Sequence, residues 1–498
     1  VTDCARRYLT EGYGCVFKRQ GIDASAKKID KPHISPIETN RDKTSAFVDS
    51  VLAMPVAEVE PVFVDFSREV QKGTLMGGNE LLAHRDVDSR LFHLSFVIER
   101  GTKEDPALEV AEQYLPYLGT DSMDASQLQS RLYALACDAT LSTEAGRTRL
   151  TLSGLAENME EALRLTERWI ATARPDTAIY AQVVNDILKL RADNKTNQKA
   201  CFNALTQYGI YGPHNAITDA MDAAQMRQIG AAGVLQHLRS LSGVAQHVLY
   251  YGPLESTQVS RLVNEVHPMS EHPEAAHDGQ FYTPLQVDES RVIIAPFQAK
   301  NTYMMGYSSR GEQFSLALKP YVGVFNEYFG GGMNSIVFQE LRESRGLAYN
   351  ASALFSQASR PSDREWFFTR IITQNDKLKD CLKVFDEIVE QMPQSESAFS
   401  LAREAVIKRM ATQRILREQI LDYYLRCRDQ GLDDDPDKAV YEKVKTMTMA
   451  DLLSFHEREI AKRKYHLLLL GDEADWDMSG LQQRGAIQRV TLKDIFGY

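Results

Sequence analysis

Apolar residues recur along this chain at two spacings, one helical and one typical of strands. The clearest helical spacing, i, i+3, i+4, i+7, predicts an amphipathic helix whose apolar face is made by Leu378, Cys381, Leu382, Phe385, Ile388, Val389 and Met392. A poorer version runs through residues 159–170, and residues 395–413 indicate a further helix. Short apolar runs such as 91–97 and 466–471 are typical of strands. Because helices and strands mix without strict alternation, the pattern favours an α+β fold over a doubly wound parallel sheet.

The order of these elements repeats after about 210 residues. A strand-like run leads into Arg-Gly at residues 100–101, and a second run leads into Arg-Gly at residues 310–311, 210 positions later. The strands that close the two copies, residues 247–252 and 466–471, are 219 positions apart. Offsets that grow smoothly are typical of one duplicated domain with small loop insertions, so the chain is expected to contain two homologous units.

The two units are expected at residues 61–266 and 291–498, each a mostly antiparallel sheet with packed helices. Residues 267–290 are polar, contain three prolines and are predicted to link the units.

The segment before the first unit has a different character. Residues 14–21 resemble the closing strand and glycine of a unit, so residues 1–21 are expected to end a preceding unit. Residues 22–60 are expected to form an extended tether. The chain is therefore expected to be the latter part of a longer polypeptide.

Composition narrows the range of partners. The chain has 498 residues, of which 43% are hydrophobic and 25% charged, and its net charge is −11. This acidic balance argues against a nucleic acid or an anionic membrane as partner, because binding phosphates takes a concentration of Lys and Arg. No apolar run reaches the roughly 18 residues that a membrane span needs. The six cysteines are too widely spread for a CxxC metal or redox motif. A protein, peptide or small molecule is the expected partner.

The sharpest local signal for chemistry lies between residues 330 and 349. Three consecutive glycines are predicted to end one helix and to permit positive φ: Gly330, Gly331 and Gly332. Asn334 or Ser335 can cap the next helix, which carries Arg342 near its end, and Tyr349 lies on the strand that follows. Seven residues apart across this turn, a guanidinium and a phenol can donate hydrogen bonds to one carbonyl or oxyanion. The alternative is that Arg342 lies on a solvated helix face and that Tyr349 serves packing.

The stretch GGGMNSIVFQELRESRGLAY resembles the corresponding part of the pitrilysin/insulinase peptidases, the inverzincins, whose metal motif is H-x-x-E-H. The resemblance covers essentially the whole chain and is stronger in the second unit. It implies the metalloprotease fold of processing peptidases, with four such units in the larger members forming two halves around a closed chamber. It also implies that Arg342 and Tyr349 bind peptide substrate near a zinc ion held by the other half.

The zinc motif itself is absent from the position where the resemblance places it. That position is the helix before Gly119, where the two histidines and the glutamate are replaced by Val110, Tyr114 and Gln113. None of these side chains can serve as the motif requires, so no metal ligand is expected in this chain.

The nearest imitation of the motif is His267-Pro-Met-Ser-Glu271-His272. Two histidines five positions apart are rotated by about 140° on a helix, so both imidazoles cannot share one face. Pro268 weakens the motif further. His247 and His466 start equivalent closing strands and are expected to be structural, and the remaining histidines have no recognisable partners in the sequence: His84, His93, His214, His237 and His456.

The function implied by the resemblance is that of the metal-free C-terminal half of a zinc metallopeptidase. Zinc is expected in the missing N-terminal half, peptide is the expected substrate, and this chain alone is expected to be inactive. Two alternatives remain open: a separately encoded inactive subunit of a heterodimeric processing-type peptidase, and a non-catalytic scaffold of the same fold. The family implies a bacterial periplasmic or exported location, but the residues do not fix a compartment.

Overall fold

The computed structural model describes residues 2–18, 21, 25, 45–55, 57–276 and 281–498, and the chain divides into two compact units, Val1–Glu58 and Val59–Tyr498. The described part of the first unit contains two short helices, α1 (Thr2–Tyr8) and α2 (Ala46–Leu52). The predicted closing strand at 14–21 does not form in the described residues 14–18 and 21. A strand needs a neighbour for its N–H and C=O groups, and both sheets take all their strands from residue 71 onward.

The extended tether expected at 22–60 lies mostly outside the described residues. Within it, residues 46–52 are helical, and the hydroxyl of Ser45 caps this helix by accepting a hydrogen bond from the Val48 N–H at 3.3 Å. Residues 57–65 carry neither helix nor strand. Helix α2 thus lies within the segment that is predicted to form the tether.

The second unit contains two six-stranded mixed sheets with packed helices, as the α+β prediction requires. Its first subdomain consists of α3 (Phe66–Glu69), β1 (Gln71–Thr74), β2 (Glu80–Arg85), β3 (Leu91–Ile98), α4 (Ala107–Tyr114), α5 (Ala125–Ala134), β4 (Cys137–Thr143), β5 (Thr148–Leu155), α6 (Met159–Thr172), α7 (Thr177–Asn194), α8 (Gln198–Tyr211), α9 (Ala223–Ser240), β6 (Gln246–Gly252) and α10 (Ser256–Val266).

The second subdomain consists of β7 (Arg291–Pro296), β8 (Asn301–Ser308), α11 (Lys319–Phe325), α12 (Ile336–Phe338), β9 (Ala348–Ser356), β10 (Trp366–Gln374), α13 (Leu378–Glu390), α14 (Glu396–Thr412), α15 (Gln419–Asp429), α16 (Asp437–Thr446), α17 (Met449–Phe455), β11 (His466–Gly471), α18 (Met478–Arg484), β12 (Ala486–Arg489) and α19 (Leu492–Phe496). The helices predicted from the apolar spacing at 378–392 and 395–413 are confirmed as α13 and α14.

The two sheets repeat one topology. The first sheet has the order β1-β2-β6-β3-β5-β4 and the second has the order β12-β7-β11-β8-β10-β9. From β2 and from β7 onward, both sheets show one parallel pair followed by three antiparallel pairs. The duplication inferred from the sequence is therefore visible in strand order and direction, and the sheets differ only at the edge strands β1 and β12.

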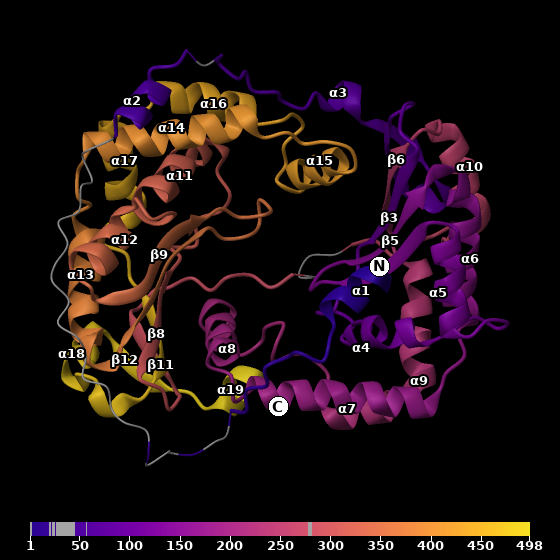
Figure 1. Ribbon diagram of the computed structural model, residues 1–498, viewed down its shortest axis with the longest axis horizontal. Helices are drawn as coiled ribbons and strands as arrows, with labels where there is room; N and C mark the ends of the chain where they lie inside the picture. Colours follow the sequence, from indigo (N-terminus) through magenta and orange to yellow (C-terminus); the bar gives the residue numbers. More distant parts are fainter. Residues whose placement is uncertain (1, 19–20, 22–24, 26–44, 56, 277–280) are drawn as a thin grey trace. The chain divides into compact units, whose positions relative to one another are not determined.

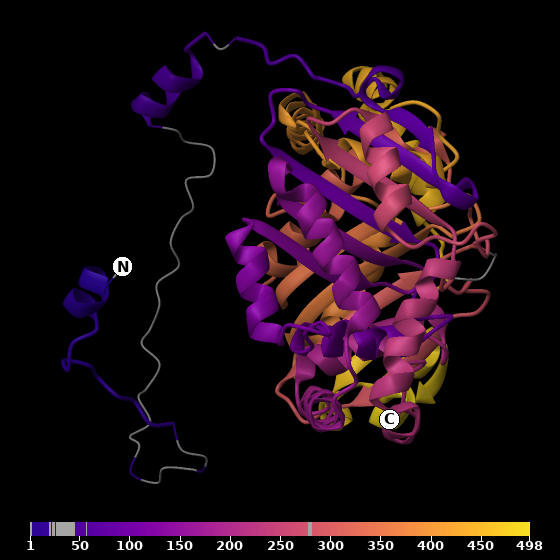
Figure 2. The same ribbon diagram turned by 90° about the vertical axis from the view of Figure 1, so that its right-hand side faces the viewer.

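The central strands bury both of their faces, which explains their nearly continuous apolar sequences. On β2, Leu81 and Ala83 point into the core beneath the helices of the same subdomain, whereas Leu82 points into a second core on the opposite face. On β11, Leu467 and Leu468 divide in the same way between two cores. Alternation with a period of two allows one strand to serve two hydrophobic layers. In Figure 2 the helices of the first subdomain, in purple and magenta, lie along the purple strands of its sheet.

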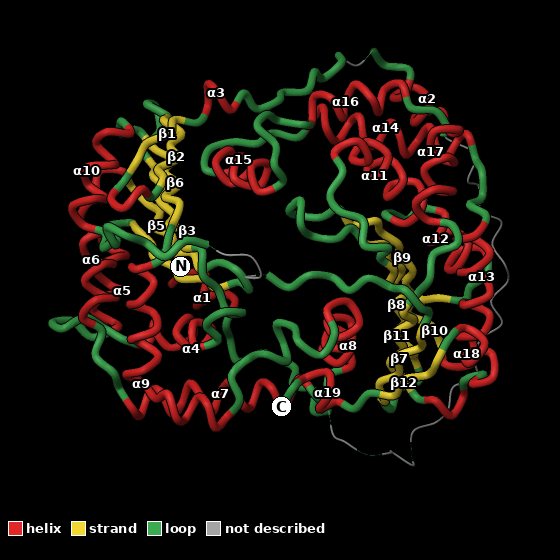
Figure 3. The backbone as a smooth tube through the Cα atoms, turned by 180° about the vertical axis from the view of Figure 1, so that it is seen from behind, coloured by secondary structure: helices red, strands yellow, loops and turns green. Residues whose placement is uncertain are grey.

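Each subdomain covers the opposite face of the other subdomain's sheet with one helix. Helix α8 of the first subdomain packs on β8 and β11 of the second, and α15 of the second packs on β2 and β6 of the first (Figure 1). The same exchange is seen from behind in Figure 3. Since each helix buries its apolar side chains against a sheet from the other subdomain, the two subdomains are held together by reciprocal docking. No helix in the described part of the chain is long and apolar enough to cross a membrane.

Candidate functional site

The sequence-predicted pair, Arg342 and Tyr349, comes together at one edge of the second sheet. The guanidinium carbon of Arg342 lies 5.8 Å from the centre of the Tyr349 ring. It lies 4.8 Å from the centre of the Phe338 ring, one helical turn before it. Arg342 therefore lies within cation–π distance of two aromatic rings, an arrangement that restrains a long, flexible side chain. The sequence analysis missed Phe338, although its i−4 spacing from Arg342 on a helix is the signal that identifies it.

Tyr349 is exposed because it occupies a β-bulge. In the pairing of β9 with β10, Ile372 faces Asn350 and Thr373 faces Ala348, so Tyr349 is the extra residue. A bulge re-aims a side chain and locally breaks the alternation of buried and exposed positions. The result is a tyrosine that is 78% exposed on a strand whose other aromatic residue, Phe355, is buried.

Two π-helical segments flank the glycine loop, at Asn326–Gly330 and Gln339–Ser344, and Arg342 belongs to the second. Such segments are rare and frequently mark functional sites. The predicted cap at Ser335 is confirmed only in position: Ser335 precedes α12, but its hydroxyl makes no capping hydrogen bond.

The three glycines serve a purpose other than the predicted positive φ, since none of Gly330, Gly331 and Gly332 has a positive φ. A Cβ on Gly330 would lie 2.1 Å from the carbonyl oxygen of Ala353, and one on Gly331 would lie 2.6 Å from the carbonyl oxygen of Asn326. Close approach of backbone to backbone is therefore the reason for glycine at these two positions.

The amide of Asn326 fixes this loop to the edge strand. Its Oδ1 accepts a hydrogen bond from the Phe355 N–H at 2.8 Å, and its Nδ2 donates to the Phe355 carbonyl oxygen at 3.0 Å. The Asn326 side chain thus makes the two hydrogen bonds that the backbone of a neighbouring strand would otherwise make to Phe355 on the edge strand β9. The helix that carries Arg342 and the strand that carries Tyr349 are consequently held in a fixed relation.

Charge distinguishes Arg342 from its neighbour Arg345. Arg345 forms ion pairs with Glu340 at 3.3 Å and Glu387 at 3.1 Å. Arg342, whose side chain is 44% exposed, approaches only Glu343 among the described carboxylates, at 3.8 Å. A half-exposed guanidinium with few partners can donate hydrogen bonds to a carbonyl or carboxylate of a bound molecule.

The position expected for a zinc motif does not fit a metal. Val110 and Tyr114 on α4 are buried, and the Tyr114 hydroxyl bonds the backbone of Asp176, donating to its carbonyl at 2.9 Å and accepting from its N–H at 2.7 Å. Among the described residues, no group of three or more His, Cys, Asp or Glu side chains is placed to hold a metal ion. In place of a metal site, Val110 packs in the core and Tyr114 anchors α4 to the backbone of Asp176, while Gln113 is exposed.

The imitation motif at 267–272 is not helical, and its first histidine has a structural partner. His267 is buried, with Nδ1 2.6 Å from Glu167 Oε1 and Nε2 3.1 Å from Gln246 Oε1. Its ring stacks on Phe96 at a centroid distance of 3.8 Å. His272 is exposed.

Other histidines have partners that sequence reasoning missed; two of these partners are brought close by the fold, and two lie only two and five residues away in the chain. They are His84 with the Glu69 carbonyl, His93 with Ser95, His214 with Asp219, and His237 with Asp105.

The comparisons with known proteins agree with this architecture. Residues 244–406 match the family model described as peptidase M16 inactive domain. No curated protein sequence matches the chain. The solved structure of a peptidase M16 inactive domain from Pseudomonas fluorescens has a TM-score of 0.66 at 17% identity and covers 82% of this chain and 99% of that chain.

Two larger proteases also match. The periplasmic protease PqqL from Escherichia coli has a TM-score of 0.62 at 14% identity, over 95% of this chain and 50% of PqqL. The ferredoxin protease FusC, solved as an E83A mutant with Arabidopsis ferredoxin, has a TM-score of 0.67 at 10% identity, over 89% of this chain and 49% of FusC. The chain thus spans about half the length of these two proteases.

The chain has the fold of these M16 structures, and its residues 244–406 match the M16 inactive-domain model; at this level the resemblance to the pitrilysin/insulinase peptidases is confirmed.

Proposed function

We propose that this chain is the metal-free half of an M16 zinc metallopeptidase and that Arg342 and Tyr349 bind peptide substrate beside the zinc ion of a separate half. The observation that carries the proposal is the convergence of the Arg342 guanidinium and the exposed Tyr349 ring, 5.8 Å apart, at a β-bulge. A solvated arginine and a packing tyrosine need neither the bulge nor the aromatic support of Phe338. The description of structural relatives as proteases supports a protein or peptide as the substrate class.

The chemistry available to the pair is hydrogen-bond donation. The Arg342 guanidinium has several N–H donors and a fixed charge, and the Tyr349 hydroxyl supplies one more donor. Both can hold a peptide carbonyl and stabilise negative charge that develops on it during hydrolysis. A zinc ion bound by the other half supplies the activated water. This chain contributes orientation and charge stabilisation.

The direct test uses Arg342→Ala and Tyr349→Phe in the enzyme reconstituted with its zinc-bearing half. Removing one donor to an oxyanion typically lowers kcat by about 10²–10³, so each variant is expected to lose activity on that scale with unchanged zinc content. Arg345→Ala is the matched control for Arg342, because Arg345 has a similar exposure of 41% but is paired with glutamates. Tyr133→Phe, on an exposed tyrosine of α5, is the control for Tyr349.

Normal turnover by both Arg342→Ala and Tyr349→Phe would reject the assigned roles. If the partner half holds its normal zinc content but the two unmodified halves together hydrolyse no peptide, the scaffold alternative is favoured. A requirement for a separately encoded zinc-bearing chain would favour the heterodimeric subunit.

A further inference from the structure

Arg370 on β10 is an exposed cation whose side chain makes no hydrogen bond or ion pair with the described residues. Its guanidinium carbon lies 6.0 Å from the centre of the Phe202 ring on α8 and 5.6 Å from that of the Phe368 ring on β10. Its cross-strand neighbours, Met305 on β8 and Ser352 on β9, carry no charge. Partial burial lowers the pKa of Arg370, and no described carboxylate opposes this effect. The two rings restrain the side chain by cation–π contact and leave its N–H donors available.

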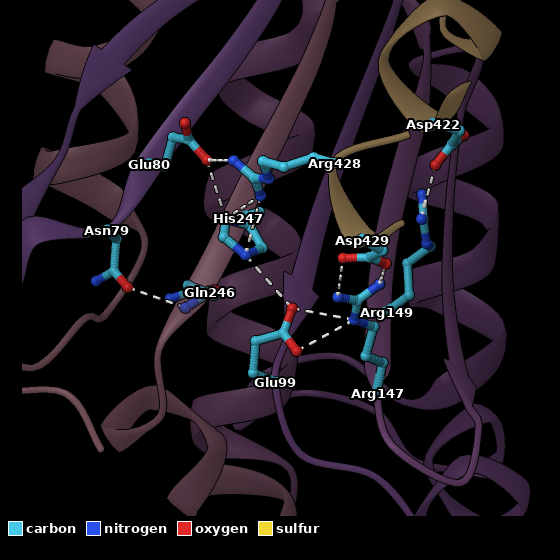
Figure 4. A network of polar contacts seen from close by, with 10 residues as sticks. All are labelled: Asn79, Glu80, Glu99, Arg147, Arg149, Gln246, His247, Asp422, Arg428 and Asp429. Carbon is cyan, nitrogen blue, oxygen red and sulfur yellow. Dashed lines mark hydrogen bonds and ion pairs between the residues drawn. The ribbon is translucent and has the colours of Figure 1, made fainter. Parts of the chain in front are cut away.

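The duplicated fold supplies a comparison, because β5 takes the place in the first sheet that β10 takes in the second. Arg149 on β5 donates a hydrogen bond to Asp422 on α15 at 2.7 Å (Figure 4). Arg147, just before β5, donates two to Asp429 of the same helix, at 2.6 Å and 3.0 Å. Helix α8, which docks on the second sheet, contains no Asp or Glu. The second docking contact therefore leaves Arg370 without the kind of partner that both arginines have in the first.

Arg370 and Tyr349 lie on the same face of the second sheet. Ala348 and Ala351 on β9 both bury their side chains in the core shared with α11 and α13. Because only Tyr349 and Asn350 separate them, these two residues at the bulge both turn to the opposite face, where both are exposed. That face is the one on which α8 packs, and the guanidinium of Arg370 lies beside α8.

The separation of Arg370 and Tyr349 follows from strand geometry. Tyr349 lies opposite the step from Ile372 to Thr373 on β10, two to three residues from Arg370. At about 3.4 Å per residue along a strand and about 4.8 Å between strands, the Cα atoms of Arg370 and Tyr349 are about 10 Å apart. An extended peptide spans this distance with about three residues.

We propose that Arg370 is a second binding point for the peptide and takes a carboxylate of the substrate about three residues from the group held by Arg342 and Tyr349. A guanidinium can receive a carboxylate through two parallel N–H···O hydrogen bonds. The inference rests on the proposed function, because it names a feature of the substrate of that same site. The carboxylate belongs to an acidic side chain or to the C-terminus of the peptide, and the experiment distinguishes these two sources.

The experiment uses the chain reconstituted with its zinc-bearing half and internally quenched decapeptides of one neutral sequence. One set carries a single Glu or Gln at each position within about four residues of the cleaved bond, and a second set has a free or an amidated C-terminus. At the position that Arg370 reaches, kcat/KM for the Glu peptide is expected to exceed that for the Gln peptide by about three- to tenfold. A preference confined to the free C-terminus would assign the site to the terminal carboxylate.

Three variants separate this inference from the proposed function. Arg370→Gln is expected to bring the ratio of kcat/KM for the acidic and the neutral peptide to one. Arg227→Gln, which alters an exposed arginine of α9, is the matched control and is expected to keep the ratio. Arg342→Ala is expected to lower the turnover of both peptides and to keep the ratio, because Arg342 acts on the peptide carbonyl.

Two outcomes would overturn the inference. One is the same ratio in Arg370→Gln as in the unmodified chain. The other is the absence of any preference for a carboxylate in the unmodified chain, which needs no variant to fold. If the two halves hydrolyse none of the peptides, the proposed function fails, and binding of fluorescently labelled versions, followed by anisotropy, decides this inference. Equal Kd values for all acidic and neutral pairs would then reject the carboxylate site.

Discussion

Gly209 offers a direct probe of the docking of α8 on the second sheet. A Cβ at this position would lie 2.4 Å and 2.6 Å from the two methyl carbons of Leu468 on β11. Leu468 is fully buried, so its side chain has no open space into which to rotate. Overpacking of this kind costs about 1–3 kcal/mol, and we expect Gly209→Ala to destabilise the protein by that amount. Gly323→Ala in α11 is the control, since a Cβ there meets no atom within 4 Å.

A double-mutant cycle separates this contact from other effects of the substitution. Leu468→Ala alone is expected to cost about 2–5 kcal/mol, because it empties a packed site. It also removes the side chain that the new methyl group strikes. The double variant should therefore be more stable than the sum of the single effects predicts, by about 1 kcal/mol or more.

Urea unfolding followed by circular dichroism gives the required differences in unfolding free energy. Additivity of the two substitutions within about 0.5 kcal/mol would refute the inferred contact between α8 and β11. So would a Gly209→Ala variant as stable as the Gly323→Ala control.

Three further variants test local features. Glu365 is fully buried with one carboxylate oxygen unpaired in the described part of the chain, and burial raises its pKa from 4.5 to about 7. The unfolding free energy should therefore fall as pH rises from 4.5 to about 7. Glu365→Gln should flatten that fall, which urea titrations at a series of pH values would measure. Asn326→Ala leaves the N–H and C=O of Phe355 without their partner and should cost about 1–3 kcal/mol per unpaired group, measured by thermal unfolding. Tyr114→Phe removes both hydrogen bonds to Asp176 and should cost a similar amount in the same assay.

The last two variants have exposed counterparts in the same chain. Asn334→Ala and Tyr117→Phe alter exposed side chains, and each should change the unfolding free energy by less than about 0.5 kcal/mol. Equal effects in a variant and its control would contradict the hydrogen bonds assigned to Asn326 or Tyr114. If the unfolding free energy of Glu365→Gln depends on pH in the same way as that of the unmodified protein, Glu365 is not the group that causes the fall in stability.

The sequence predicted those parts of the fold that depend on local periodicity. The apolar spacing from Leu378 to Met392 identified α13 because a helix buries one stripe of its own residues. The repeat of strand runs predicted two subdomains, and both sheets show the same strand order. The seven-residue spacing of Arg342 and Tyr349 across a turn predicted that their side chains lie near each other, and the guanidinium carbon of Arg342 lies 5.8 Å from the centre of the Tyr349 ring.

Features that depend on distant partners were not predictable. Helices α8 and α15 each pack on the sheet of the other subdomain. The apolar spacing of α15 shows that it buries one face, but it does not show which sheet that face contacts. The bulge at Tyr349 depends on a one-residue mismatch between two strands. The prediction for the glycine loop failed for a related reason. Positive φ is a local property that glycine often provides, whereas the close approach of Gly330 to Ala353 is a tertiary contact that the local sequence does not show.

The measurement that tests the central claim most directly is the zinc content and peptidase activity of this chain alone, and then of the chain mixed with a zinc-bearing M16 half from the same organism. We predict that the chain alone holds no zinc and hydrolyses no peptide. The mixture is predicted to contain zinc, bound by the added half, and to hydrolyse peptide. Stoichiometric zinc bound by this chain alone would contradict the reading of Val110, Gln113 and Tyr114, and a zinc-loaded mixture without activity would contradict its role as the completing half of a peptidase.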